Sequence, residues 1–363
     1  MSQHIPALTG VRGVAAVWVV LLHLSQSLRS TIGFNEAAPF IQSGFLGVDL
    51  FFILSGAVMY HVHAADFPQY RIKSHLAFLR LRFARVYPLH AFCLFAFALI
   101  IYLLPDFTAP YRPGTFSFSN FAATLLLVNN WGFMPTTLWN GPAWSLSAEW
   151  LGYLAFPFIV LGIKRFVPRG FELAYALALL FIFLIGMLAI NAPDLGQMNK
   201  LGIIRMLFEF SAGCLFYKAA MGKVQSHKWT LPLSLTVILG CTYRIEYHWG
   251  AVFGLGLLVM SLCRQSRFSD ILFGNAVAIW LGNISFSLYL SHWPLIQIYQ
   301  WASQRTNIDK HFLAAMLVAA IIGVAPLLYH FVEVPSRRYL RGKMQNQHSS
   351  TLADTAIDIA AVR

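Results

Sequence analysis

Long runs of apolar residues, separated by short polar segments, dominate this chain. The runs hold roughly 17 to 22 residues, and a helix of that length crosses a hydrocarbon core about 30 Å thick. The pattern therefore predicts an all-α fold, a polytopic membrane helix bundle with about ten transmembrane helices. The predicted spans are residues 11–28, 45–62, 86–104, 148–163, 171–190, 201–217, 230–244, 250–263, 278–300 and 312–332.

A further apolar stretch, residues 121–128, is too short to span a membrane and leads into the polar, turn-rich segment 129–142. We predict a re-entrant or interfacial piece here. With ten spans and both termini cytoplasmic, 19 of the 26 lysines and arginines face the cytoplasm, as the positive-inside rule requires. A full span at 121–128 would turn Lys164, Arg165 and Arg169 outward and weaken that bias.

The composition agrees with lipid as the main solvent, because 58% of the residues are hydrophobic and only 11% are charged. The net charge of +12 follows from membrane topology, and no basic patch with interleaved aromatic residues indicates a nucleic-acid partner. The four cysteines lie in apolar runs without metal-ligand spacing, so we expect packing residues and no metal site. We expect a membrane-embedded domain at residues 1–343, in the cell inner membrane, and a disordered cytoplasmic tail at 344–363.

Ionisable side chains inside a spanning helix are costly and therefore mark candidate functional sites. Arg12 and His23 are eleven residues apart, which at 100° per residue places both on one face of the first helix, about 16 Å apart along its axis. Burial disfavours a charged imidazole, so His23 is expected to be neutral and able to accept a proton from a hydroxyl. The pair predicts a polar line through the membrane, with His23 as the catalytic base.

Further charged candidates lie in the second span and between the second and third spans. Asp49 is predicted at the depth of His23, where a carboxylate either orients the imidazole, as in a catalytic triad, or caps a helix or pairs with a loop. Arg82 and Arg85 stand one helical turn apart before the third span. Guanidinium groups bind phosphate bidentately, so this pair suits a nucleotide-bearing donor, although positive-inside charge alone would also place arginines here.

The remaining candidates come from the later spans. Ser147 and Glu149 lie where the re-entrant piece meets the span at 148–163, on the expected outward side. Glu149 either orients the catalytic histidine, contacts acceptor hydroxyls or caps its helix. Ser285, Tyr289 and His292 share a face at i, i+4 and i+7 and are expected to line the same cavity. His292 is either a second base or a hydrogen-bonded core histidine beside a proline kink.

Together these residues resemble the acyltransferase 3 family of integral membrane proteins, and the likeness covers nearly the whole chain. Arg12 and His23 match the family's R-x10-H motif, and Arg82 and Arg85 match its R-x-x-R motif. The blocks around Asp49, Glu149 and His292 add to the resemblance. It implies that His23 is the essential base, that Arg12 serves donor binding or organisation, and that Arg82 and Arg85 contact coenzyme A.

The expected reaction is transfer of an acyl group, most simply acetyl, from cytoplasmic acyl-CoA to a hydroxyl of a cell-surface or exported carbohydrate or glycolipid. Acyl-CoA is then a co-substrate, and no permanently bound cofactor is expected. We expect a stand-alone form without an SGNH-type hydrolase domain. We therefore expect the acceptor to be acylated directly or through a separate periplasmic partner protein.

Two other classes of function fit parts of this pattern. A secondary transporter of an acylated sugar or lipid would use the intramembrane histidine and aspartate as a proton relay and would consume no thioester. A non-catalytic subunit of a polysaccharide assembly complex would tolerate an isosteric Asn or Gln at His23, which an enzyme would not.

Overall fold

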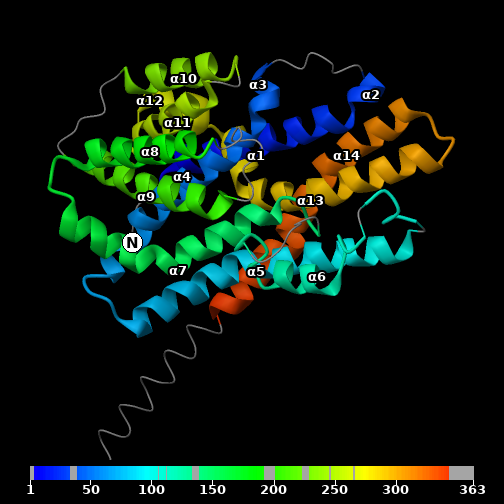
Figure 1. The fold of residues 1–363 in the computed structure, drawn as a ribbon, viewed down its shortest axis with the longest axis horizontal. Coiled ribbons are helices and arrows are strands. Elements are labelled where there is room, and N and C mark those ends of the chain that lie inside the picture. The colour runs from blue at the N-terminus through cyan, green and yellow to red at the C-terminus, as the bar shows by residue number, and fades with distance from the viewer. Residues whose placement is uncertain are drawn as a thin grey trace, which may run out of the picture.

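The protein is described from a computed structural model and is all-helical over the part of the chain that it describes (Figure 1). That part comprises residues 4–32, 39–104, 106–111, 113–132, 139–191, 201–222, 229–244, 247–264 and 266–342. The predicted tail at 344–363 lies outside it.

The first half of the chain contains α1 (Pro6–Ser27), α2 (Arg29–Ile32), α3 (Pro39–Gln42), α4 (Leu46–His63), α5 (Ile72–Leu103), α6 (Phe118–Leu125) and α7 (Ala143–Phe166). The second half contains α8 (Glu172–Ala189), α9 (Gly202–Met221), α10 (Thr230–Cys241), α11 (His248–Leu262), α12 (Arg267–Phe273), α13 (Ala276–Arg305) and α14 (Lys310–Leu328). A π-helical turn, Tyr329–Glu333, follows α14, and the helix continues to Gly342.

Every predicted span coincides with a helix, which confirms the polytopic bundle. Within the described residues, six helices are long and apolar enough to cross a membrane, or seven if α12 and α13, which are bent by 57°, form one span. This number is lower than the ten predicted because α10 and α11 are short and α9 carries charged residues. The stretch 121–128, predicted to be re-entrant or interfacial, lies partly in the short helix α6.

Small residues let the central helices approach closely, as is common in membranes. A Cβ atom added to Gly213 of α9 would lie 2.0 Å from a backbone carbonyl oxygen of α4. A Cβ atom added to Gly282 of α13 would lie 1.9 Å from the carbonyl oxygen of Thr9 in α1. The pairs α1 with α13 and α4 with α9 therefore form the backbone-to-backbone core around which the other helices pack.

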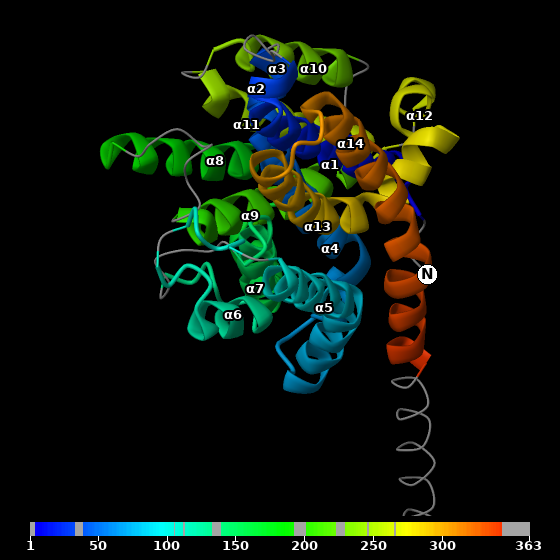
Figure 2. The ribbon, with the colours of Figure 1, turned by 90° about the vertical axis from the view of Figure 1, so that its right-hand side faces the viewer.

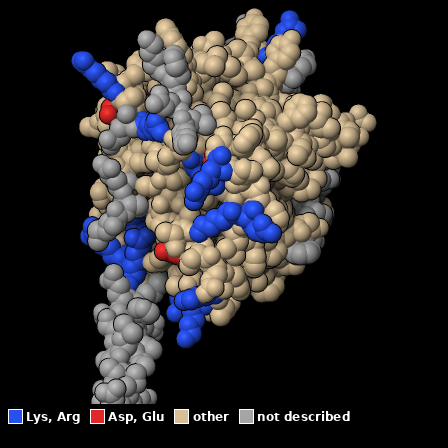
Figure 3. All heavy atoms as spheres, turned by 90° about the vertical axis from the view of Figure 1, so that its left-hand side faces the viewer, with Lys and Arg blue, Asp and Glu red and all other residues tan. Residues whose placement is uncertain are grey.

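Basic residues gather at the end of the bundle where α5 begins and α7 and α9 end (Figure 3). Lys164 and Arg165 lie in the last turn of α7, and Lys218 lies in the last turn of α9. The ammonium group of Lys164 donates to the carbonyl oxygens of Ala64 and Phe67 at 3.0 and 2.8 Å. This cation therefore satisfies backbone acceptors just beyond the end of α4.

Candidate active site

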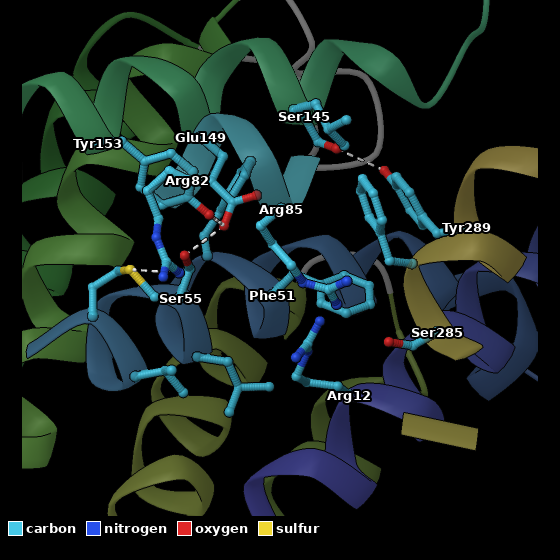
Figure 4. Close-up of a pocket in the computed structure, with 16 residues that line it drawn as sticks. Arg12, Phe51, Ser55, Arg82, Arg85, Ser145, Glu149, Tyr153, Ser285 and Tyr289 are labelled. Atoms are coloured by element: carbon cyan, nitrogen blue, oxygen red, sulfur yellow. Dashed lines mark hydrogen bonds between the residues drawn. The ribbon is translucent and has the colours of Figure 1, made fainter. Parts of the chain in front are cut away.

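A cavity of about 150 Å³ lies inside the bundle between α1, α4, α5, α7 and α13 (Figure 4). Six of the residues predicted from sequence line it: Arg12, Arg82, Arg85, Glu149, Ser285 and Tyr289. Aromatic and apolar side chains of α4 and α13, among them Phe51 and Phe286, complete its wall. The cavity thus brings together polar groups from five helices in an otherwise apolar interior.

Arg12 reaches the cavity from α1, and Figure 4 shows its side chain pointing toward Arg85. It is half-buried and makes no hydrogen bond or ion pair with any residue that the structure describes. The charge of Glu149 lies near enough to interact with it. A guanidinium group inside a helix bundle without a direct counter-ion is costly, so this position favours an anionic ligand.

Arg82 and Arg85 enter the cavity from α5 and have different surroundings. Arg82 contacts the Met59 sulfur at 3.5 Å and His63 Nε2 at 3.3 Å, and its Nε atom is buried with no partner within the described chain. Arg85 pairs with the buried carboxylate of Glu333 and lies 5.5 Å from the centroid of the Phe286 ring. Arg82 therefore keeps donor capacity for a ligand, whereas Arg85 is held in place.

Glu149 is the acidic residue that lines the cavity, and its Oε1 atom accepts two hydrogen bonds (Figure 4). Ser55 donates at 2.5 Å and Tyr153 donates at 2.6 Å. Neither bond involves His23, so the predicted orienting contact is absent among the described residues. Because three guanidinium groups outnumber the lining carboxylate of Glu149 and the Glu333 carboxylate that pairs with Arg85, the cavity carries a net positive charge.

Hydroxyl groups of α7 and α13 meet at one wall of the cavity. The hydroxyls of Ser145 and Tyr289 are 2.8 Å apart, and Figure 4 shows them joined across the gap between the two helices. Ser285 also lines the cavity, but its hydroxyl donates to the Gly282 carbonyl one turn earlier at 2.8 Å. Tyr289 is therefore the hydroxyl of α13 that links the cavity to the neighbouring helix.

His23 lies outside the cavity lining and pairs with His292 of α13. The two rings stack at 5.1 Å, with His23 Nδ1 2.9 Å from His292 Nε2. His292 is fully buried, and its Nδ1 atom is 3.2 Å from the Leu288 carbonyl oxygen. A carbonyl only accepts, so His292 Nδ1 carries a proton, and neutral His292 accepts from His23 at Nε2. His23 Nδ1 is then the donor, and His23 Nε2 keeps a free lone pair.

The middle of α13, where His292 lies, also contains a proline. Pro294 has no N–H group, which leaves the Leu290 carbonyl without its usual helical partner. The side-chain amide of Asn140 donates to this carbonyl at 3.3 Å. The segment before α7 is thereby tied to α13 beside the histidine pair, next to the ring of Tyr289, whose centroid is 6.0 Å from that of His292.

Asp49 does not orient His23, which corrects one of the two interpretations of this residue. Its carboxylate forms a bidentate ion pair with Arg205 of α9, with a distance of 2.7 Å from Arg205 Nε to Asp49 Oδ1. Glu209 lies 3.7 Å from the same guanidinium group. All three side chains are buried. Because a buried guanidinium needs a counter-ion, Asp49 joins α4 to α9 instead of the catalytic histidine.

Ser147 also lies outside the cavity lining. Its hydroxyl accepts a hydrogen bond from the backbone N–H of Asn130 at 3.1 Å, and its carbonyl accepts from Trp131 Nε1 at 3.1 Å. Ser147 therefore anchors the segment after α6 to α7.

Sequence reasoning missed the partners of the predicted residues. Glu333 follows the last apolar run, and Arg205 and Glu209 sit four residues apart inside the run at 201–217. The position of Arg205 and Glu209 inside an apolar run is the signal that could have found them, by the same rule that selected Arg12. Tyr153 gave no such signal, since aromatic residues are common throughout these helices.

No group of three or more His, Cys, Asp or Glu side chains in the described part of the chain could hold a metal ion. The arrangement suits proton transfer at His23 and binding of an anionic group by the arginines.

Comparison with known proteins places these residues in context. Residues 5–330 match the family described as an acyltransferase domain. The acyltransferase MdmB of Streptomyces mycarofaciens is 27% identical over 98% of this chain and 97% of its own length. The putative peptidoglycan O-acetyltransferase YrhL of Bacillus subtilis is 27% identical over 92% of this chain. The peptidoglycan O-acetyltransferase OatA of Listeria monocytogenes is 22% identical over 93% of this chain. This chain spans about half of the last two proteins, 55% and 56% of their lengths. No solved structure matches.

Proposed function

We propose, from the premise that this chain belongs to the acyltransferase 3 family and is a membrane acyltransferase, that it transfers an acyl group from acyl-CoA to a hydroxyl of a carbohydrate or glycolipid. Acetyl is the group we assign, because YrhL and OatA are named as O-acetyltransferases. We assign a carbohydrate acceptor because both of these names refer to peptidoglycan.

One observation supports the choice of donor: Arg12, Arg82 and Arg85 line the cavity and outnumber the nearby carboxylates, Glu149 and Glu333. Coenzyme A carries a diphosphate and a 3′-phosphate, and guanidinium groups bind such oxyanions strongly in a low-dielectric site. The donor phosphates lie against these arginines, and the thioester arm extends toward Tyr289.

The acceptor hydroxyl binds beside His23. His292 donates to the Leu288 carbonyl and accepts from His23 Nδ1, so the free lone pair of His23 is on Nε2. There His23 Nε2 accepts the hydroxyl proton as the oxygen attacks the thioester carbonyl carbon. A C–O bond forms, the C–S bond breaks, and the leaving thiolate takes the proton back from His23. The products are an ester and free coenzyme A. His292 positions His23 and does not contact the substrate.

The membrane orientation follows from charge. Both termini and the basic end of the bundle face the cytoplasm of the inner membrane, so acyl-CoA enters over Arg82, and the acceptor approaches from the opposite side. A separate periplasmic protein passes the group onward where the acceptor cannot reach His23.

The test is thiol release from acetyl-CoA by the detergent-purified protein, with a crude glycan-lipid extract as acceptor. We expect acceptor-dependent release that is lost in His23→Gln and retained in His90→Gln. His90 is an apt control because it is a fully buried histidine away from the cavity, with Nε2 2.8 Å from the Thr124 carbonyl oxygen.

Two outcomes would contradict the proposal. Thiol release that is unchanged in His23→Gln would show that His23 is not the catalytic base. Transport of an acylated sugar into proteoliposomes without any thioester consumption would favour the proton-coupled transporter.

A further inference from the structure

The helix that follows α14 meets the cavity arginines through Glu333. This side chain is 1% exposed, pairs with Arg85, and accepts a hydrogen bond from Ser287 of α13 at 2.7 Å. Glu333 therefore fixes one face of the helix against α5 and α13.

The π-helical turn determines that Glu333 lies on the inward face of this helix. Seven residues beyond the buried Ala325, an uninterrupted α-helix would present Val332 to the bundle. A π turn adds one residue to the helix, so Glu333 takes that inward position. Turns of this kind occur frequently at functional sites.

Arg337 lies near the face of Glu333, and Arg341, which is exposed, lies at the edge of that face. They follow Glu333 by four and eight residues, which corresponds to rotations of about 40° and 80° and to rises of about 6 and 12 Å along the axis. Tyr339, on the other side of the helix, is 63% exposed. Figure 2 shows this last part of the helix running past the end of α13, alongside the first half of α5.

The charges of these two residues lie near those of the cavity. Arg337 interacts electrostatically with Arg12 and Arg85, and Arg341 interacts with Arg82. Like charges in proximity repel, and the nearby Glu333 is already paired with Arg85. The charges of Arg337 and Arg341 therefore add to those of the three arginines that line the cavity, which favours a polyanion more strongly than the three alone.

We propose that Arg337 and Arg341 extend the cavity into a binding site for the 3′-phosphate of the acyl-CoA donor. The inference rests on the proposed function, in which the thioester points toward Tyr289. The nucleotide is at the opposite end of coenzyme A, and these two arginines lie at the outer end of the line of guanidinium groups. Both residues lie beyond the segment 5–330 that matches the family.

The experiment measures equilibrium binding of labelled acetyl-CoA and of 3′-dephospho-acetyl-CoA to the full chain in phosphatidylcholine nanodiscs. The variants are Arg337→Gln, Arg341→Gln and the double substitution. Arg338→Gln is the matched control, since it removes the same charge from the neighbouring position on the same helix. We expect each substitution to weaken acetyl-CoA binding by about tenfold, the contribution of one charge-assisted hydrogen bond. Each variant should bind the dephospho donor as tightly as the wild-type protein binds it. Arg338→Gln should bind both donors with wild-type affinity.

Three outcomes would overturn the assignment. An equal loss for both donors would mean that the arginines act only through their general field. Wild-type affinity of the double variant in phosphatidylcholine, with a difference only in phosphatidylglycerol nanodiscs, would assign them to lipid headgroups. If the wild-type protein binds neither donor, the acyl-CoA proposal fails, and this inference fails with it.

Discussion

Replacing His292 tests whether one buried histidine positions another. The side-chain oxygen of Gln occupies the place of the His Nε2 atom, whereas the amide of Asn occupies only the place of Nδ1. His292→Gln therefore keeps an acceptor for His23 Nδ1, which is 2.9 Å from Nε2 in the wild-type protein. His292→Asn keeps the bond to the Leu288 carbonyl but leaves His23 Nδ1 without its partner.

The expected loss of activity follows from the His23 Nδ1–H group, which lacks its acceptor in His292→Asn. A donor left unsatisfied in a buried site costs about 1–3 kcal/mol, which corresponds to a roughly 5- to 150-fold change in rate. We expect His292→Asn to lower kcat by this factor. The KM for acetyl-CoA should not change, because His292 does not line the cavity. His292→Gln should retain most of the wild-type kcat.

The measurement is initial-rate thiol release at varied acetyl-CoA concentration, with the thermal midpoint of each variant recorded to exclude misfolding. Equal activity of the Asn and Gln variants would refute the positioning role of His292. A raised KM at constant kcat would refute it too, because it would mean that His292 contacts the donor.

Three further predictions concern charge and packing. Asp49→Ala should destabilise the fold by about 3–5 kcal/mol because it removes the bidentate carboxylate that faces the buried Arg205, and a chemical-denaturation midpoint like that of the wild-type protein would contradict this. Glu333→Gln should lower the thermal midpoint by unpairing Arg85, and coenzyme A should restore more stability than it adds to the wild-type protein; an equal shift would contradict a phosphate role for this arginine. Gly213→Leu should prevent the close contact of α9 with α4, so a monodisperse, fully folded variant on size exclusion would argue against the packing described.

The helices and several cavity residues could be predicted because the evidence for them is local. An apolar run specifies a spanning helix wherever it stands, and 100° per residue fixes which of its residues share a face. Arg12 and His23 illustrate this, since α1 directs one toward the cavity that α13 lines and the other toward His292. The cost of burying charge likewise identified Arg82, Arg85 and Glu149 as candidates from their positions along the chain.

The partners of these residues could not be read in the same way. Asp49 and Glu149 were both candidates to hold His23, yet Asp49 binds Arg205 and Glu149 binds Ser55 and Tyr153. Each alternative places a carboxylate at a similar depth. The choice depends on the rotation and separation of neighbouring helices, which the hydrophobic pattern of a single helix does not encode.

The sequence by itself determined where the helices lie along the chain, the shared face of Arg12 and His23, and the charge asymmetry of the two ends. The tertiary structure alone decided that His23 pairs with His292 across 269 positions of chain and that a π turn aims Glu333 at Arg85. The physical reason is that periodicity and burial act along one helix, whereas a hydrogen bond requires two helices to match in depth, rotation and distance to within a few tenths of an ångström.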